Sequence, residues 1–225
     1  MSTRTVVAID GPAGTGKSTI AKRLADRLGF VYVDSGAMYR AVALWALRLG
    51  VAVDDAHRLE QLAAAASIEF AAGSRIVLLN SEDVTEAIRD PAVTSASSKV
   101  SAVPGVRRAL VARQREIAAS ASVVMEGRDI GSVVFPEAQV KVFLDADPME
   151  RARRRVAEMN GASLEEVARE IAERDRRDST RADSPLRQAP DADFIDTTRM
   201  SLDEVEERVL KLVRHRTSNG KDQTN

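Results

Sequence analysis

The sequence lacks cysteine, long apolar runs and a net charge of any size, and each lack excludes a class of protein. Without cysteine, neither a disulfide nor a thiolate metal site can form. No apolar stretch is long enough to span a membrane, and the first ten residues hold no signal-peptide core, so we expect a cytoplasmic protein with no membrane partner. A formal net charge of -1 creates no general field for nucleic acid, and we expect no nucleic-acid partner.

What the sequence does contain is an alternation of strand-like and helical patterns. At 225 residues the chain is long enough for a large core. Five short apolar runs have the composition of β-strands: Val6 to Ile9, Phe30 to Val33, Val123 to Met125, Val140 to Leu144, and Phe194 to Ile195. Helical patterns between most of them predict an α/β fold with a parallel sheet covered on both faces. Ligands bind at the carboxyl ends of such strands, where the following acidic residues stand: Asp10, Asp34, Glu126 and Asp145.

The first of these strands leads into the string GPAGTGKS, residues 11–18. The spacing G-x-x-x-x-G-K-S between a strand and a helix is typical of a phosphate-binding loop. Its glycines let backbone N–H groups point inward, and the helix dipole adds positive potential. Lys17 supplies a full charge, and the Ser18 hydroxyl suits Mg2+. We expect these residues to hold the nucleotide: Gly11, Pro12, Ala13, Gly14, Thr15, Gly16, Lys17, Ser18 and Thr19.

Two segments interrupt the alternation. Ser67 to Thr85 has short β-rich runs around the turn residues AAG, which predicts a small antiparallel hairpin. Pro148 to Arg181 is a charged helical pair broken at Asn160-Gly161, with a capping box from Ser163 to Glu166. Its arginines fit either a solvated surface or a hinged lid that closes over phosphates. The surface interpretation is the one we adopt for Arg153, Arg155, Arg169 and Arg177.

These segments divide the expected single domain, residues 1–225, into parts. The core is predicted to comprise residues 1–50, 100–147 and 182–225, with an insert at about 51–99 and a lid at about 148–181. The residues after Arg214 are polar and aperiodic, so we expect a frayed tail there. We expect His57 and His215 to lie at the surface. Tyr39 and Trp45 share a helical face with Val42, which predicts core packing.

Phosphate loops serve several chemistries, and the sequence excludes one of them. A GTPase needs the guanine-reading string N-K-x-D, which does not occur. A mechanical ATPase with Glu126 as its water-activating acid stays open, as does a nucleotide-gated binding protein that hydrolyses ATP slowly. A small-molecule kinase needs an acceptor pocket, cations for anionic groups and movable covers, and the sequence has candidates for each.

Several longer strings resemble the bacterial type of cytidylate kinase, a P-loop nucleoside monophosphate kinase. They are IDGPAGTGKST, DSGAMYRA, EGRDIGSVVFPEA, VFLDADPMERARRR and RDRRDSTRADSPLRQAPDA, and the likeness runs from about Thr5 to about Arg214. The resemblance implies a central parallel sheet flanked by helices, with a small inserted antiparallel β segment and a helical, arginine-rich lid. It also implies transfer of the γ-phosphoryl group of ATP to CMP and dCMP; a different pyrimidine monophosphate is the alternative acceptor.

The resemblance also assigns roles to individual residues. It places Arg40 and Arg128 on the acceptor phosphate with Ser35 beside them, and Arg107, Asp129 and Ser98 on the base. It places Asp178 on the ribose, Arg174 and Arg181 on phosphates, and Arg154, with Arg151 as a further candidate, on the ATP side. The catalytic residues it implies are Lys17, Arg128, Arg174 and Arg181.

Two of these assignments have support in the residues themselves. A carboxylate such as Asp129 can accept a hydrogen bond from the cytosine 4-amino group, whereas the uracil carbonyl would be repelled. Arg174, Asp178 and Arg181 have the spacing of one helical face. Arg107, by contrast, also fits a surface helix charge like its neighbour Arg108.

The expected cofactor is Mg2+, bound together with the phosphoryl donor ATP. Ser18, phosphate oxygens and water are its expected ligands, and the choice between Asp34 and Asp10 as a partner through water stays open. The expected partners are the small nucleotides alone, with the protein as a monomer.

Overall fold

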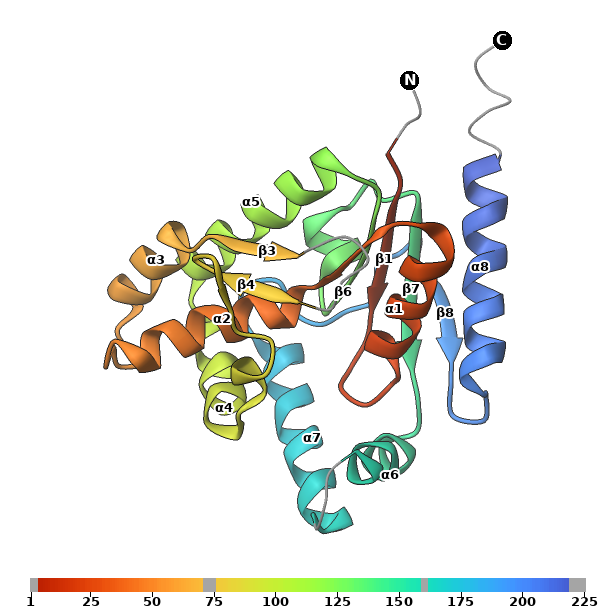
Figure 1. The fold of residues 1–225 in the computed structure, drawn as a ribbon. Helices are drawn as coiled ribbons and strands as arrows, with labels where there is room; N and C mark the ends of the chain where they lie inside the picture. Colours follow the sequence, from red (N-terminus) through yellow and green to blue (C-terminus); the bar gives the residue numbers. More distant parts are fainter. Residues whose placement is uncertain (1–3, 71–75, 159–161, 219–225) are drawn as a thin grey trace.

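The computed structural model describes residues 4–70, 76–158 and 162–218, and its centre is a five-stranded sheet (Figure 1). The strands are β1 (Val6–Asp10), β2 (Val31–Asp34), β6 (Val123–Gly127), β7 (Val140–Asp145) and β8 (Asp193–Asp196). Their order is β2-β6-β1-β7-β8, and every pairing is parallel. The predicted α/β class and all five strands are confirmed. The second strand begins one residue later than predicted and includes Asp34.

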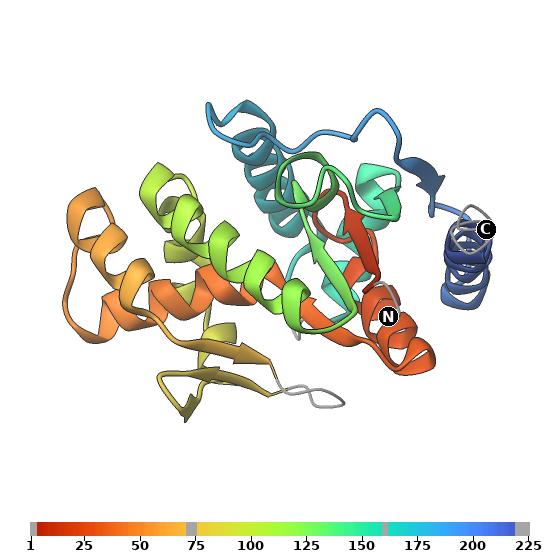
Figure 2. The same ribbon diagram turned by 90° about the horizontal axis from the view of Figure 1, so that it is seen from above.

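Helices cover both faces of this sheet because side chains alternate along each strand. Val7 and Ile9 of β1 pack in a cluster with α1 (Lys17–Leu28) and α8 (Leu202–Ser218). Ala8 lies in the cluster with α2 (Ser35–Arg48) and α5 (Pro104–Ser120) on the other face. Figure 2 shows α8 and α5 on opposite sides of the strands. Both faces are therefore buried, as a doubly covered parallel sheet requires.

The predicted core and surface positions of single residues also agree with the structure. Tyr39 is buried, and Trp45 packs against the larger apolar cluster. His57 and His215 are exposed. Among the described residues, no helix is long and apolar enough to cross a membrane.

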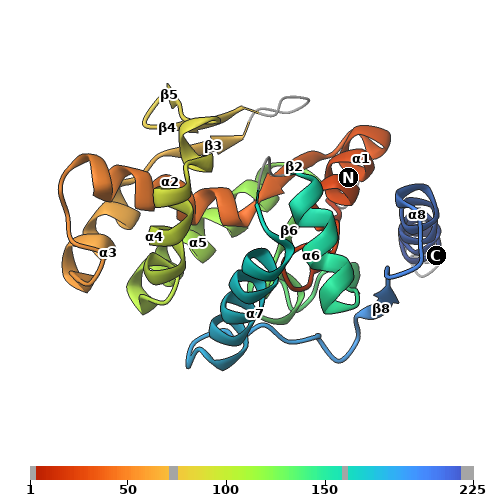
Figure 3. The same ribbon diagram turned by 90° about the horizontal axis from the view of Figure 1, so that it is seen from below.

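The insert between α2 and α5 contains a small antiparallel sheet, as the sequence predicts (Figure 3). After α3 (Ala56–Ala65) come β3 (Ile68–Phe70), β4 (Val77–Leu79) and β5 (Glu82–Asp83). The third strand was not predicted; it forms because Asn80 and Ser81 adopt φ of 51° and 69°, the left-handed turn that joins tight hairpins. A short 3-10 turn, η1 (Ala87–Arg89), and α4 (Pro91–Val100) complete the insert.

Two helices, α6 (Pro148–Ala157) and α7 (Leu164–Thr180), form the helical pair predicted for this segment, which we call the lid; its action as a cover stays a prediction. They lie beyond the carboxyl ends of the strands (Figure 1). The Glu166 N–H donates to Ser163 Oγ at 3.1 Å, which confirms the predicted cap of α7. A small apolar cluster of Ala152, Val167 and Ile171 joins the two helices. The predicted break at 160–161 lies outside the described residues.

The prediction of a frayed tail after Arg214 is wrong for its first residues, because α8 continues to Ser218. Val213 is buried, Arg216 donates to Asp193 at 2.6 Å, and the Thr217 hydroxyl donates to the Val213 carbonyl at 2.8 Å. These contacts hold the last turn against β8 although its residues are polar. The remainder of the predicted tail, residues 219–225, lies outside the described residues.

Candidate active site

The phosphate loop joins β1 to α1 and has the geometry that its glycines allow. Gly11, Gly14 and Gly16 all adopt positive φ, of 147°, 78° and 90°. A Cβ on Gly11 would lie 2.0 Å from the Leu144 carbonyl oxygen, so the loop approaches β7 as closely as only glycine permits. No side chain caps α1 at Gly16, and its first N–H groups begin at the loop. This strand, loop and helix match the sequence prediction.

Lys17 is buried beneath this loop. Its Nζ donates to the Pro12 carbonyl at 2.5 Å and to Thr15 Oγ1 at 3.4 Å. Burial, and then the positive charge of Arg128, lower the pKa of Lys17 to about 7, while the carboxylate of Glu126 acts in the opposite direction. The ammonium is therefore held in a site where an added anion would stabilise its charged form.

Asp10, at the end of β1, supports the segment that follows β6. Its carboxylate accepts the N–H groups of Ile130 at 2.8 Å and Gly131 at 2.7 Å. These residues begin a short π-helix, η2 (Ile130–Val134). Burial raises the pKa of Asp10 to about 7 in spite of the two hydrogen bonds. Both carboxylate oxygens of Asp10 thus accept hydrogen bonds from the backbone that follows Asp129. The strand and loop patterns in the sequence did not predict this contact between β1 and η2.

The ends of β2 and β6 place two further carboxylates side by side. Asp34 pairs in register with Glu126, caps α2 by accepting the Ala37 N–H at 2.9 Å, and accepts Arg40 Nη2 at 2.7 Å. The Tyr32 hydroxyl donates to Glu126 at 2.6 Å. Burial, and then the charge of Asp34, raises the pKa of Glu126. Arg40 therefore reaches the carboxyl edge of the sheet.

Asp129 lies buried between two guanidinium groups. Arg107 forms an ion pair with its Oδ2, and Arg181 Nη2 lies 3.5 Å from its Oδ1. The Arg107 guanidinium also lies 5.5 Å from the centre of the Tyr39 ring. Arg107 is only 2% exposed, so its alternative interpretation as a surface charge is wrong, whereas Arg108 beside it is exposed.

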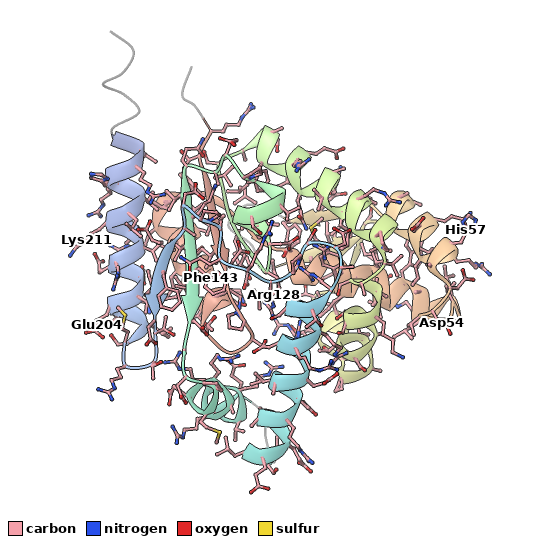
Figure 4. All side chains as sticks on the ribbon, turned by 180° about the vertical axis from the view of Figure 1, so that it is seen from behind. Asp54, His57, Arg128, Phe143, Glu204 and Lys211 are labelled. Carbon is pink, nitrogen blue, oxygen red and sulfur yellow. The ribbon has the colours of Figure 1, made fainter. Side chains whose placement is uncertain are left out.

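A second carboxylate continues this cluster. Arg128 Nε donates to Asp178 at 2.8 Å, and Arg181 Nη1 lies 3.9 Å from the same carboxylate. The cluster therefore alternates arginine and aspartate from α5, across the end of β6, to the lid. Figure 4 shows Arg128 near the middle of the molecule, beside α7.

Arg181 does not share a helical face with Arg174 and Asp178, and that prediction is wrong. Helix α7 ends at Thr180, and Arg181 is its extended C-cap residue, with φ of -62° and ψ of 141°. The chain turns here because the Leu186 N–H donates to the Asp178 carbonyl at 2.8 Å. Arg181 still joins the predicted cluster, from the loop rather than from the helix.

The other predicted residues are dispersed around this centre. Ser35 Oγ donates to the Glu126 carbonyl at 2.7 Å. Ser98 accepts Arg177 Nη1 at 2.9 Å, so Arg177, although half-exposed, joins the lid to α4 rather than making only surface ion pairs. Arg154 donates to the Thr197 hydroxyl at 3.0 Å and to its carbonyl at 2.7 Å. An open hollow lies near this last contact, lined by Asp147, Asp196, Thr198, Arg199 and Met200.

Comparison with known proteins identifies the family. The family model described as cytidylate kinase matches residues 7–215. The chain belongs to the cytidylate kinase family. A cytidylate kinase of Solibacter usitatus (strain Ellin6076) is 62% identical over 97% of this chain and 96% of that protein. A cytidylate kinase of Geobacillus kaustophilus (strain HTA426) is 51% identical over 96% of this chain and 99% of that protein.

Solved structures support the fold of this kinase at much lower identity. A gluconokinase from Sinorhizobium meliloti 1021 is 14% identical, with a TM-score of 0.51, over 99% of this chain and 98% of that one. An uncharacterized protein from Eubacterium ventriosum ATCC 27560 is 13% identical, with the same TM-score, over 92% of this chain and 97% of that one. At this identity the likeness concerns the fold, and the family assignment depends on the sequence relatives.

Proposed function

We propose that this enzyme transfers the γ-phosphoryl group of ATP to CMP and dCMP, with ADP and CDP or dCDP as products. The observation that carries this proposal is the buried carboxylate of Asp129, held between Arg107 and Arg181 beside the phosphate loop's own strand. A fixed carboxylate accepts a hydrogen bond from the exocyclic amine of cytosine, and adjacent guanidinium groups donate to ring nitrogen or carbonyl oxygen. The named relatives, at 62% and 51% identity, support the same assignment.

On the donor side, backbone amides of the phosphate loop and the amino end of α1 would bind the phosphates of ATP. Lys17 would bridge to the transferring group, and Arg154 would lie toward the rest of the donor nucleotide. Three glycines with positive φ give the loop the curvature that this binding needs.

On the acceptor side, Arg40 and Arg128 would bind the monophosphate, with Ser35 beside them. Asp178 would accept from the ribose, and Ser98 would contact the base together with Arg107 and Asp129. Arg128 and Arg40 both lie at the carboxyl edge of the sheet, where they can reach an acceptor opposite Lys17.

The phosphoryl group would transfer between these sites by in-line displacement, stabilised by cations. Negative charge spreads over the equatorial oxygens during transfer, and Lys17, Arg128, Arg174 and Arg181 would offset it. Among the residues that the structure describes, Arg174 makes no ion pair, and burial followed by the charge of Arg128 lowers its pKa to about 10. Such a cation is suited to an anionic partner that arrives with the substrates. The scheme needs no general base.

Mg2+ is the proposed cofactor, and the residues at the loop fit it. Ser18 lies in the first turn of α1, its hydroxyl interacts with the Glu126 carboxylate, and Asp34 lies beside Glu126, so the available ligands are oxygens. Among the described residues, no three or more Asp, Glu or His side chains gather into a group that could hold a metal ion. When bound, the cation supplies charge neutralisation and orientation of the phosphates. Asp10 is the weaker candidate, because both its oxygens accept backbone N–H groups.

We further infer the following organisation. Residues 148–181 act as the lid and residues 51–99 as the acceptor-side insert of one domain, in a monomeric cytoplasmic enzyme without membrane or nucleic-acid partners. The contact between Arg177 and Ser98 supports a lid and an insert that meet over the acceptor site.

The direct test is a coupled assay of ADP formation with ATP and each of CMP, dCMP, UMP, dTMP and AMP. We expect turnover with CMP and dCMP to exceed that with UMP by about 10²-fold, because an unmatched buried base edge costs a few kcal/mol. Stronger turnover on another monophosphate would reassign the acceptor. ADP formation that is independent of any acceptor would favour a nucleotide-gated ATPase instead.

ATP binding should take up a proton above neutral pH. In the free enzyme burial lowers the pKa of Lys17 to about 7, so the ammonium loses its proton as pH rises through 7. Phosphate anions favour the charged form, so the bound enzyme recovers that proton, and affinity should fall by up to about tenfold per pH unit between pH 7 and 9. Calorimetry at pH 8 in buffers of different ionisation enthalpy measures the uptake, and Lys17→Met should abolish it. A binding heat that is the same in every buffer would contradict the prediction.

A further inference from the structure

Among the described residues, the hydrogen bonds between the lid and the phosphate loop are made at Ala13. The Ala13 N–H donates to Asp175 Oδ1 at 3.2 Å, and its carbonyl accepts Arg151 Nη1 at 3.0 Å. Asp175 lies on α7 and Arg151 on α6, so each lid helix holds one side of the same loop residue. Ala13 also packs against the apolar cluster that joins the lid helices. We name this contact, of Ala13, Arg151 and Asp175, the lid clasp.

The two side chains of the lid clasp are themselves bound together. Arg151 Nη1 forms an ion pair with Asp175 Oδ2, and Arg151 Nε donates to the Ala146 carbonyl at 3.1 Å. The side chains are 9% and 16% exposed, so water competes little for these bonds. A Cβ on Gly14 would lie 2.8 Å from the Arg151 carbonyl oxygen, which shows that α6 lies directly against the loop.

This arrangement fixes the orientation of the two peptide groups on either side of Ala13, in the middle of the anion-binding loop. With both the N–H and the carbonyl of Ala13 bound, the curvature that points the following amides inward is set before phosphate arrives. The same anchor fixes α7 at Asp175, next in sequence to Arg174. The charge of Arg174 acts on Lys17, so the guanidinium lies near the loop's lysine.

We propose that Asp175 and Arg151 are a positioning pair that couples the lid to the phosphate loop and so aligns Arg174 with the donor phosphates. The inference rests on the proposed function in one respect, that the loop binds ATP. It assigns to Asp175 no contact with either substrate. Acceptor binding should be independent of the pair, because Asp178 is held separately by Arg128 and Arg181.

The test is Asp175→Ala, with kcat and KM measured for both substrates and ATP affinity measured by calorimetry. We expect KM and Kd for ATP to rise about tenfold and kcat to fall about tenfold or more, with KM for CMP changed less than about twofold. Asp175→Asn keeps an oxygen that can accept from the Ala13 N–H but loses the negative charge that pairs with Arg151. Its KM and Kd for ATP and its kcat should therefore lie between those of Asp175→Ala and those of the native enzyme. Glu170→Gln, an exposed change on the same helix, is the matched control and should leave all constants unchanged.

A double-mutant cycle separates the pair from general stability. Arg151→Met keeps the aliphatic part of the side chain and removes the guanidinium group. Because the two side chains act together, the double variant should lose no more than about twofold in ATP affinity and kcat beyond either single variant. Thermal unfolding measured in parallel identifies any variant that is unfolded at the assay temperature, in which case Asp175→Asn and Arg151→Lys carry the test.

Three results would overturn the inference: native ATP constants in Asp175→Asn and Asp175→Ala, equal losses for ATP and CMP, or additive losses in the cycle. The proposed function fails separately, through the native enzyme's choice of acceptor. ATP affinity is read without any acceptor, so the two failures are distinguishable.

Discussion

Replacing Lys17 with alanine is expected to lower kcat by about 10³-fold, the loss typical of one preorganised donor to a transition-state oxyanion. Lys17 is the buried cation of the phosphate loop, and its Nζ lies within reach of the loop's own Pro12 carbonyl. In the proposed mechanism Lys17 would supply charge where charge develops on the transferring group, so kcat should fall by a larger factor than KM for ATP changes. Steady-state kinetics with CMP at saturation measures the effect.

The fold should tolerate this change. Burial lowers the pKa of Lys17, which means that the folded state disfavours its charge, so removal of the ammonium relieves a desolvation cost that offsets the loss of its hydrogen bond to the Pro12 carbonyl. Thermal unfolding should therefore show a melting temperature close to that of the native enzyme. Lys211→Ala, on the exposed face of α8 (Figure 4), is the control and should keep native turnover. Near-native turnover in Lys17→Ala would remove this lysine from the mechanism.

Asp129→Asn is expected to raise KM for CMP by about 10²-fold while KM for ATP changes little. The amide can present N–H groups where cytosine also presents its amine, so the base edge and the side chain are mismatched. The same amide suits the uracil carbonyl, so the preference for CMP over UMP should narrow. Turnover on both acceptors, measured on one preparation of the variant, gives this ratio directly.

The ratio of turnover on CMP to turnover on UMP is the decisive measurement, because Asp129 also stabilises the structure around it. It neutralises Arg107 and approaches Arg181, and its loss leaves two buried guanidinium groups near each other, which costs about 3–5 kcal/mol in comparable cases. The CMP to UMP ratio is independent of the folded fraction, so it separates recognition from stability. Asp83→Asn, an exposed change on β5, serves as the control. Equal effects on ATP and CMP, or an unchanged ratio, would show that Asp129 does not read the base.

The sheet and the phosphate loop could be predicted from the sequence because their signals are local. The apolar run before Asp10, the glycines after it and the helical period from Ile20 onward each lie within a few residues. The cap at Ser163 is equally local, and the structure confirms it. The third strand of the insert was missed because it has only two residues, too few for any periodic pattern.

The contacts that complete the candidate site could not be predicted, because they join residues far apart in the chain. Arg107 looks like Arg108 in sequence, and only the packing of α5 buries one and exposes the other. Arg181 fits a helical face by spacing, but a backbone bond from Leu186 ends the helix one residue before it. The Asp175 bond to Ala13 spans 162 positions, a separation at which a sequence pattern carries no signal.

The strand order has a consequence for the chain during its synthesis. Strand β1 lies between β6 and β7, and within the described part of the chain its strand partners both follow residue 122. While the first half of the polypeptide leaves the ribosome, the backbone groups of Val6–Asp10 have no sheet partner. Long-range parallel pairing of this kind forms late and leaves apolar strands open to wrong association. A nascent chain that stalls before Val123 thus carries every glycine of the phosphate loop but neither of the two strands that pair with β1.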